Sequence, residues 1–255
     1  YSRAEVLGRS PRFLRGPRTQ PAEMARIGAA MRRREPVRTE IAHATRQGQP
    51  TWLELTIQPI FDENGWHTHW VAVARDIGER RETEAQVHRL AYFDQLTGLP
   101  NRSRFVKDAT PWLEAAEAQG LVGAAILLDL DKFKSINENW GHRSGDAVLR
   151  EVALRLRSCV SADYLVARLH ADEFIVLLRG GDGNEAEAAR LAQEQCRAIL
   201  RALAAPTRIG EREHYTSASM GIAVFGSEPL TLDELVARAD SAMELAKQNG
   251  RRTFR

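Results

Sequence analysis

The stretch ARLHADEFIVLL (residues 167–178) sets two adjacent acids, Asp172 and Glu173, in a short polar gap between two apolar runs. Apolar runs of this length on either side of a polar gap are typical of two strands joined by a tight turn. Adjacent carboxylates in that turn are compatible with a metal site and equally with a solvated hairpin tip. The rest of the chain supplies the observations that bear on this choice.

Composition limits the classes of protein to which the chain can belong. Its 255 residues suffice for one large domain or two ordinary ones, and 43% hydrophobic with 27% charged residues describes a globular protein. The net charge of +2 gives no general case for nucleic-acid binding, and we interpret the basic stretch 31–38 as a solvated helix end. The longest apolar run, 121–128, is too short to span a bilayer, and residues 1–10 lack a signal-peptide core. We expect no nucleic-acid partner, no membrane segment in this chain and a cytoplasmic location.

The first third of the chain is predicted to be a small α/β unit followed by a connector. Residues 20–35 have a helical period, with Met24, Ile27 and Met31 on one face. Residues 51–76 alternate like two strands around the turn at Asn64-Gly65. The highly charged segment 77–93 has only a thin apolar stripe, so we expect a connecting helix or a short coiled coil.

The remaining residues predict an α+β domain with a palm-like arrangement. A turn and helix open it. The later elements are a strand at 123–133, a loop running into a second helix over 135–160, a hairpin at 164–179, a helix at about 185–204, a strand at 214–225 and a helix at 231–250. Thr231 is placed to cap the last helix and Gly250 to end it. This order favours an antiparallel sheet flanked by helices.

Several polar residues stand where such a fold could use them. Asp129 ends an apolar strand, beside the hairpin that carries Asp172 and Glu173. Carboxylates so placed suit Mg²⁺, although exposed acids at a sheet edge would look the same. Lys134 follows Asp129 closely, and Lys247 and Arg251 are expected on one face of the last helical turn, either to meet phosphate or to balance the helix dipole.

Asn137 and Asp146 flank the glycine-containing loop ENWGHRSG. An amide and a carboxylate at such a loop could bind the edge of a nucleobase, and they could equally be ordinary polar loop residues. Their spacing alone leaves both interpretations open.

Five ordered motifs resolve these ambiguities together: DQLTGLPNRSRF, DLDKFKSINENWGHRSGD, ARLHADEF, SMGIA and ADSAMELAKQNGRR. From about Phe93 to the end of the chain they closely resemble the GGDEF domain of bacterial diguanylate cyclases. The resemblance implies GTP as substrate, cyclic di-GMP and pyrophosphate as products, and a homodimer, because each active site of this family holds half of the product.

The resemblance also implies roles for individual residues. The Mg²⁺ or Mn²⁺ ligands would be Asp129, the carbonyl of Leu130, and Asp172. Asp172 would also deprotonate the attacking hydroxyl, with Glu173 beside it and Lys134 neutralising phosphate charge. The residues implied in GTP binding are Phe133, Asn137, His142, Asp146, Lys247 and Arg251.

The signature itself departs from the family. The family has two glycines where this chain has His170 and Ala171. Glycine permits a positive φ and leaves room for nucleotide beside the backbone. A side chain in the substrate's volume would impair positioning, so we expect binding to persist better than turnover. The family's Arg-x-x-Asp product-inhibition site is replaced at the matching offsets by Ser161 and Tyr164.

Residues 1–77 resemble the later part of a PAS domain of the flavin-binding LOV branch, without that family's first two strands. Pro11 stands where the photochemistry needs a cysteine, and Leu53 and Ala74 replace flavin-contacting amides. We therefore expect no flavin. The predicted organisation is a PAS-like sensor at 1–77, a linker helix at 78–92 and a GGDEF domain at 93–255.

Three functions fit these observations. The first is a degenerate GGDEF module that binds GTP and regulates an attached or partner EAL phosphodiesterase domain. The second is an active diguanylate cyclase. The third is an inert dimerisation scaffold, which would have no need of Asp129, Asn137, Asp146 and Asp172.

Overall fold

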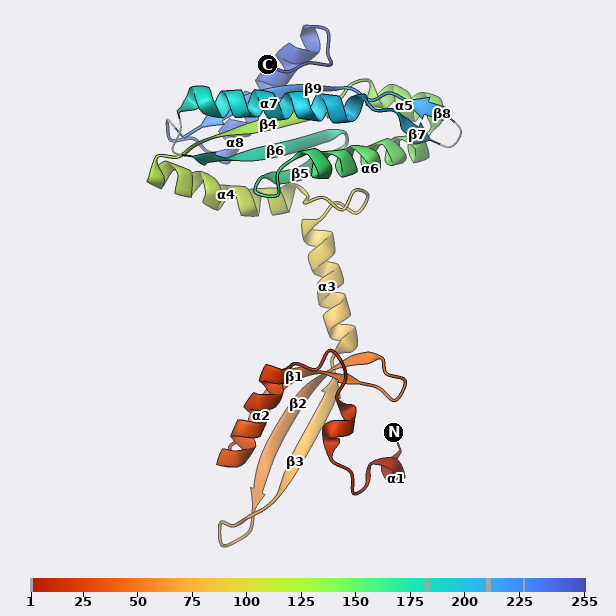
Figure 1. Cartoon of the computed structure of the whole chain (residues 1–255), viewed down its shortest axis with the longest axis vertical. Helices are drawn as coiled ribbons and strands as arrows, with labels where there is room; N and C mark the ends of the chain where they lie inside the picture. The colour runs from red at the N-terminus through yellow and green to blue at the C-terminus, as the bar shows by residue number, and fades with distance from the viewer. Residues whose placement is uncertain (1, 182–183, 210–211, 227) are drawn as a thin grey trace. The chain divides into compact units, whose positions relative to one another are not determined.

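The computed structural model describes residues 2–181, 184–209, 212–226 and 228–255. The chain forms two compact units, Tyr1–Val87 and His88–Arg255, and each is described by itself (Figure 1). Within the described residues, no helix is both long and apolar enough to cross a bilayer.

The N-terminal unit is a three-stranded antiparallel sheet with the helix α2 packed against it. Its elements are α1 (Arg3–Val6), the 3₁₀ helix η1 (Pro11–Leu14), α2 (Pro21–Arg33), β1 (Val37–Ala44), β2 (Pro50–Phe61) and β3 (His67–Asp76). The strands lie in the order β1-β2-β3. Ile27 of α2, Ile41 of β1 and Ile57 of β2 form the centre of a small core. The predicted hairpin is therefore confirmed as β2–β3.

Strand β1 is an element that the sequence did not predict. The basic stretch at 31–38 was interpreted as a helix end, and α2 does end at Arg33, where Arg34 adopts a left-handed φ of 58°. Val37 and Arg38, however, already belong to β1 and pair with β2. The inward positions of β1 include Thr39 and His43, so its apolar alternation is weak.

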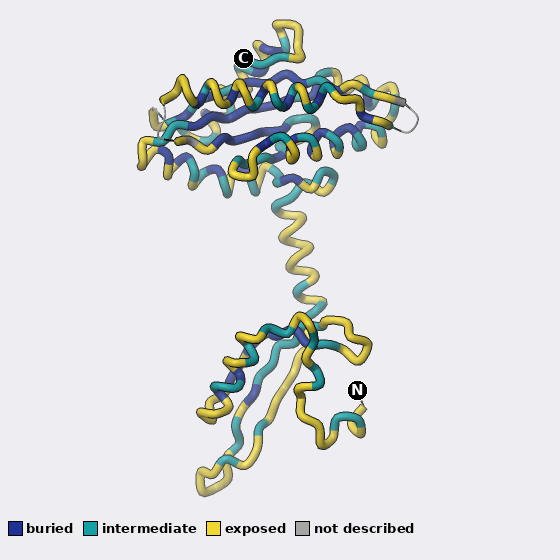
Figure 2. Tube along the Cα trace, viewed as in Figure 1, coloured by how far each residue is buried: buried dark blue, intermediate teal, exposed yellow. Residues whose placement is uncertain are grey.

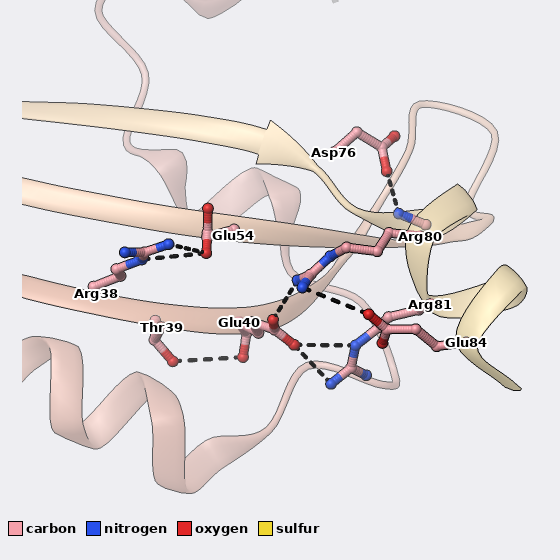
Figure 3. Close-up of polar contacts among 9 residues, drawn as sticks. Arg38, Thr39, Glu40, Glu54, Asp76, Arg80, Arg81 and Glu84 are labelled. Atoms are coloured by element: carbon pink, nitrogen blue, oxygen red, sulfur yellow. Dashed lines mark hydrogen bonds and ion pairs between the residues drawn. The ribbon is translucent and has the colours of Figure 1, made fainter. Parts of the chain in front are cut away.

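The helix α3 (Gly78–Tyr92) begins directly after β3, and side chains fix its first turn to the sheet (Figure 3). The N–H of Gly78 donates a 2.8 Å hydrogen bond to the Asp76 carboxylate. Glu40 of β1 accepts from Arg80 at 2.7 Å and pairs with Arg81 at 2.9 Å. The Arg81 guanidinium also stacks 3.6 Å above the Trp52 ring. Beyond this joint α3 buries no residue, as its sequence predicts (Figure 2).

The C-terminal unit is built on a four-stranded antiparallel sheet in the order β5-β6-β4-β9. The strands are β4 (Val122–Leu130), β5 (Leu165–His170), β6 (Glu173–Gly181) and β9 (Ala218–Phe225). Helices α6 (His142–Cys159) and α7 (Glu185–Ala204) cover one face, and α4 (Arg102–Gln119) and α8 (Leu232–Gln248) cover the other. Alternate residues of β4 enter the two cores, Ile126 and Leu128 on one side and Leu127 on the other. The predicted palm-like α+β fold is confirmed.

Two smaller features complete this unit. The short helix α5 (Phe133–Trp140) follows β4 directly, and β7 (Thr207–Ile209) and β8 (Arg212–His214) form a separate two-stranded sheet. The predicted strand at 214–225 begins only at Ala218 because the preceding residues form this small sheet and its exit. Thr231 caps α8 as predicted, accepting a hydrogen bond from the N–H of Glu234.

Candidate functional site

The signature hairpin turns at Ala171, which lies between the end of β5 and the start of β6. Ala171 adopts a φ of 44°, the left-handed conformation that glycine takes most easily. His170 pairs in register with Glu173, and its ring is 73% exposed with Nδ1 3.9 Å from the Glu173 carboxylate. The backbone therefore follows the turn despite its two non-glycine residues, and both added side chains remain at its tip.

The β4–β6 ladder brings the predicted metal ligands to one sheet edge. Asp129 is the register partner of Glu173, and the N–H of Leu130 donates a 3.3 Å hydrogen bond to the carbonyl of Asp172. Burial, followed by the charge of Asp172, raises the pKa of Asp129 to about 6. The ammonium of Lys247 lies 3.3 Å from the Asp129 carboxylate and counteracts part of this effect. The edge thus concentrates negative charge that a cation would neutralise.

The donor set at this edge fits Mg²⁺ or Mn²⁺. Asp129 and Asp172 offer carboxylate oxygens and Leu130 a main-chain carbonyl, all of them hard ligands. Across the described residues there is no group of three or more His, Cys, Asp or Glu side chains that could hold a metal by themselves. A cation here would therefore rely on two carboxylates, main-chain oxygen and the phosphate oxygens of a nucleotide, which is the usual pattern for Mg²⁺.

The predicted base-reading residues meet at the junction of α5 and α6. Gly141, with φ 78°, ends α5 and caps α6, so Asn137 and Asp146 come from consecutive helices. Asp146 lies 4.0 Å from Arg150 one turn later in α6. His142 is exposed at the first position of α6. These residues are close in the fold, and their role with guanine stays a prediction.

Gly145 belongs to this junction, and sequence reasoning assigned it no role. A Cβ at Gly145 would overlap the side-chain oxygen of Asn137 and would stand 3.1 Å from the Phe133 ring. The glycine in HRSGD thus makes room for the Asn137 amide. A buried glycine three residues into a helix is the signal that could have identified this contact.

The predicted phosphate-binding residues differ in their exposure and in their contacts. Lys134 is 89% exposed and lies 3.7 Å from Glu138, and Lys247 contacts both Asp129 and Glu244. Burial alone would lower the pKa of Lys247, but Glu244 and Asp129 outweigh it and raise that pKa. Phe133 points into the core, so only its backbone at the start of α5 is available to a ligand.

The expectation for Arg251 was wrong in one respect. Helix α8 ends at Gln248, and Arg251 lies beyond it with a left-handed φ of 62°. Arg251 and Lys247 therefore do not share a helical face. The helix ends with Asn249 as its C-cap, and the φ of 100° at Gly250 turns the chain out of the helix.

Arg168 is a second residue to which sequence reasoning assigned no role. Its guanidinium donates to the carbonyl of Ala171 at 3.0 Å and to the Asp94 carboxylate at 2.9 Å, and it is only 11% exposed. Asp94 also accepts from the N–H of Thr97 at 2.8 Å. Although burial opposes ionisation, the hydrogen bonds from Thr97 and Arg168 outweigh it and lower the pKa of Asp94. The turn that follows α3 is thereby attached to the signature hairpin.

Comparison with known proteins agrees with this geometry. The family model of the diguanylate cyclase GGDEF domain matches residues 91–253, and a PAS domain model matches residues 1–79. The protein y4lL of Sinorhizobium fredii is 37% identical over 85% of this chain and 26% of its own length. The cyclic di-GMP phosphodiesterase PdeR of Escherichia coli is 37% identical over 70% of this chain and 26% of its own length. The chain thus spans about a quarter of these relatives.

A solved structure gives the same result for the C-terminal unit. The GGDEF domain of TpbB (YfiN) from Pseudomonas aeruginosa is 34% identical and superposes with a TM-score of 0.58, covering 63% of this chain and 91% of that one. The sheet order, the sheet-edge carboxylates and the match over residues 91–253 identify the chain as a member of the GGDEF family, with a PAS domain before its GGDEF domain.

Proposed function

We propose that this chain is a regulatory module of cyclic di-GMP signalling. Its GGDEF domain would bind GTP with Mg²⁺ or Mn²⁺, form cyclic di-GMP slowly or not at all, and relay a signal from the PAS domain to an attached or partner EAL phosphodiesterase domain. The alignment of a relative named as a cyclic di-GMP phosphodiesterase over 70% of the chain supports this context. We further propose the boundaries 1–77, 78–92 and 93–255 for sensor, linker helix and GGDEF domain.

The observation that supports the proposal is the contrast between the sheet end of the signature hairpin and its tip. On one side the Leu130–Asp172 hydrogen bond and the Asp129–Glu173 register hold the ligand-binding edge together. At the tip, the exposed His170 ring and the Ala171 methyl replace two hydrogens. Binding groups are preserved while the space beside the reacting atoms is reduced, and a misplacement of about 1 Å can lower a rate roughly 100-fold.

In this proposal each residue has a defined task. Asp129, Asp172 and the Leu130 carbonyl would hold the cation, which would neutralise phosphate charge. Asn137 and Asp146 would bind the guanine edge, with His142 beside them. Lys134, Lys247, Arg251 and the backbone of Phe133 would meet the phosphates. Asp172 would accept the proton of the attacking hydroxyl, assisted by Glu173.

A homodimer is part of the proposal because cyclic di-GMP contains two nucleotides. Helix α3 exposes Val87 to 58% and Leu90 to 54%, and its described residues are otherwise largely polar. Such a thin stripe suits a short two-stranded coiled coil.

An active diguanylate cyclase is the second candidate. The φ of 44° at Ala171 favours it, because the turn keeps the backbone path that a glycine would give and adds only one methyl group there. If catalysis requires only this backbone path, the domain remains active despite its altered signature.

The experiment that separates these candidates measures binding and turnover on the same sample. Purified protein is titrated with GTP and Mg²⁺ by calorimetry and then assayed for cyclic di-GMP. The regulatory module binds GTP and forms little product, whereas the cyclase forms product in repeated turnovers. Absence of GTP binding would contradict both and favour a dimerisation scaffold.

A further inference from the structure

A cavity of about 570 Å³ lies between α5, the β7–β8 sheet and the segment that follows α8. Figure 1 shows α5 beside β7 and β8 at one end of the C-terminal unit. The volume is in the range of sites that bind small organic ligands. Its lining includes the basic residues Lys132, Arg251 and Arg252 and the ring-bearing residues Trp140, His214 and Tyr215.

Three of these residues are cations whose side chains have no partner among the described residues. Lys132, Arg251 and Arg252 make no side-chain hydrogen bond or ion pair within the described parts of the chain. All three have left-handed backbones, with φ of 60°, 62° and 51°. Each such conformation costs on the order of 1 kcal/mol, and residues held in this way cluster at functional sites.

The backbone that carries these cations is held by Asp131. Its carboxylate accepts from Ser217 Oγ at 2.7 Å, Ser219 Oγ at 2.7 Å and the N–H of Arg252 at 3.1 Å. The N–H of Asp131 in turn donates to the Ser217 carbonyl at 2.9 Å. Asp131 also lines the cavity, but within the described residues its carboxylate forms no ion pair with the three cations, so it anchors the loop and leaves their side chains available.

Another part of the lining is aromatic. The rings of Trp140 and His214 meet edge to face with centroids 5.0 Å apart, and Tyr215 beside them is 65% exposed. Burial lowers the pKa of His214, so this ring is neutral at pH 7. Flat uncharged rings next to unpaired guanidinium and ammonium groups match a ligand with a planar base and phosphate groups.

This cavity is distinct from the substrate site proposed above. Of the residues assigned to GTP or the cation, only Arg251 lines it. At about 100° per residue, the lining residues Ser135 and Asn139 project from the flank of α5 opposite Asn137. The cavity and the base-reading residues therefore occupy different sides of one helix.

We propose that the cavity is a second nucleotide site, which binds a nucleoside polyphosphate with its base against Trp140 and Tyr215 and its phosphates on Lys132 and Arg252. Arg251 couples this site to the first, because a phosphate bound in the cavity draws its guanidinium away from the substrate phosphates. Occupancy then weakens GTP binding. The coupling rests on the proposed function, whereas binding in the cavity does not.

Titration of the whole chain with ATP in EDTA tests the site. Adenine lacks the guanine edge, and EDTA removes the cation that the substrate site requires. We expect saturable binding that weakens tenfold or more in Lys132→Gln/Arg252→Gln, variants that keep the anchoring backbone hydrogen bonds. Lys134→Gln, the same substitution on the other flank of α5, is the matched control and should bind ATP like the unmodified chain. Tyr215→Ala should weaken ATP several-fold and leave pyrophosphate binding unchanged.

Four results would overturn the proposal: no ATP binding by the unmodified chain, equal ATP binding by the double variant, an equal loss in Lys134→Gln, or indifference of ATP to Tyr215→Ala. GTP with Mg²⁺ is titrated separately, with and without saturating ATP. Failure of GTP to bind contradicts the proposed function and leaves the ATP result standing. GTP affinity that ATP does not change contradicts the coupling through Arg251.

Discussion

The N–H of Leu130 donates a hydrogen bond to the carbonyl of Asp172 across 3.3 Å, so the two sequence motifs that carry the proposed metal ligands are joined directly through the backbone. Strands β4 and β6 fix this relationship by their register, in which Asp129 faces Glu173. The carboxylates consequently approach each other whether or not a ligand is bound. Their mutual repulsion is therefore a property of the fold itself.

Asp129→Asn is expected to stabilise the metal-free protein at pH 7 while it abolishes cation-dependent nucleotide binding. The folded-state pKa of Asp129 is about 6, above its ordinary value of 3.8. The folded state therefore binds more protons than the unfolded state between these values, and stability falls as pH rises through this window. This difference in the pKa of Asp129 corresponds to a gain in the free energy of unfolding of at most roughly 3 kcal/mol at pH 7 for Asp129→Asn. The gain should vanish near pH 4.

Urea unfolding in EDTA at pH 4 and pH 7 measures this effect. Asp163→Asn, which removes an exposed acid of the same unit, is the control and should change little. A loss of stability in Asp129→Asn at pH 7 would show that Asp129 is a structural residue.

Gly145→Ala and Asn137→Ala are expected to weaken GTP more than ATP. The alanine Cβ at position 145 would displace the Asn137 amide, so the two variants should share one defect. Losing a hydrogen-bonded partner of the base corresponds to roughly 1 to 3 kcal/mol of affinity. Calorimetry with both nucleotides in the presence of Mg²⁺ measures the ratio.

Equal losses for GTP and ATP would show that Asn137 does not read guanine. Gly181→Ala serves as the control for a glycine substitution, since a Cβ there meets nothing within 4 Å.

Arg168→Gln is expected to destabilise the C-terminal unit by roughly 3 kcal/mol, because it leaves the half-buried Asp94 carboxylate and the Ala171 carbonyl without their cation. Denaturant unfolding of this variant, of Asp94→Asn and of the double variant gives the coupling energy. The exposed pair Arg190–Glu187 is the matched control, and Arg190→Gln should change stability by less than about 1 kcal/mol. Additive losses for Arg168 and Asp94 would mean that the two side chains do not act together.

Much of the fold follows from the sequence because its pattern is strong where elements are long. Alternate residues of β4 enter two separate cores, and the amphipathic helices that cover them are equally regular. Strand β1 escaped prediction because Thr39 and His43 occupy inward positions and interrupt the apolar alternation. The β7–β8 sheet escaped because strands of three residues carry too little pattern to detect.

The candidate site likewise has residues that the sequence predicts and residues that it does not. Residue types and motif order indicate Asp129, Asp172, Asn137 and Asp146, and the sheet register and helix junction bring them near one another. The Arg168–Asp94 pair spans 74 positions of sequence, and no local pattern reveals a contact of that range. Arg251 was misplaced because it was assigned to the last helical turn, although Gly250 ends the helix before it and Arg251 itself has a left-handed φ.

In the proposed function, His170 and Ala171 limit turnover and not binding. Restoring glycine at both positions removes two Cβ atoms from the signature turn and leaves Asp129, Asp172 and Glu173 untouched. Glycine at 171 relieves a left-handed alanine by on the order of 1 kcal/mol, and glycine at 170 costs roughly 0.5 to 1 kcal/mol in backbone entropy, so stability should hardly change.

The most direct test is the rate of cyclic di-GMP formation by the dimeric protein at saturating GTP and Mg²⁺, before and after His170→Gly/Ala171→Gly. We predict that both proteins bind GTP with similar affinity and that the double variant forms product about tenfold faster or more, equivalent to about 1.4 kcal/mol of barrier per factor of ten. A native rate that the double variant does not improve would show that His170 and Ala171 do not limit turnover, and would identify the chain as an ordinary diguanylate cyclase.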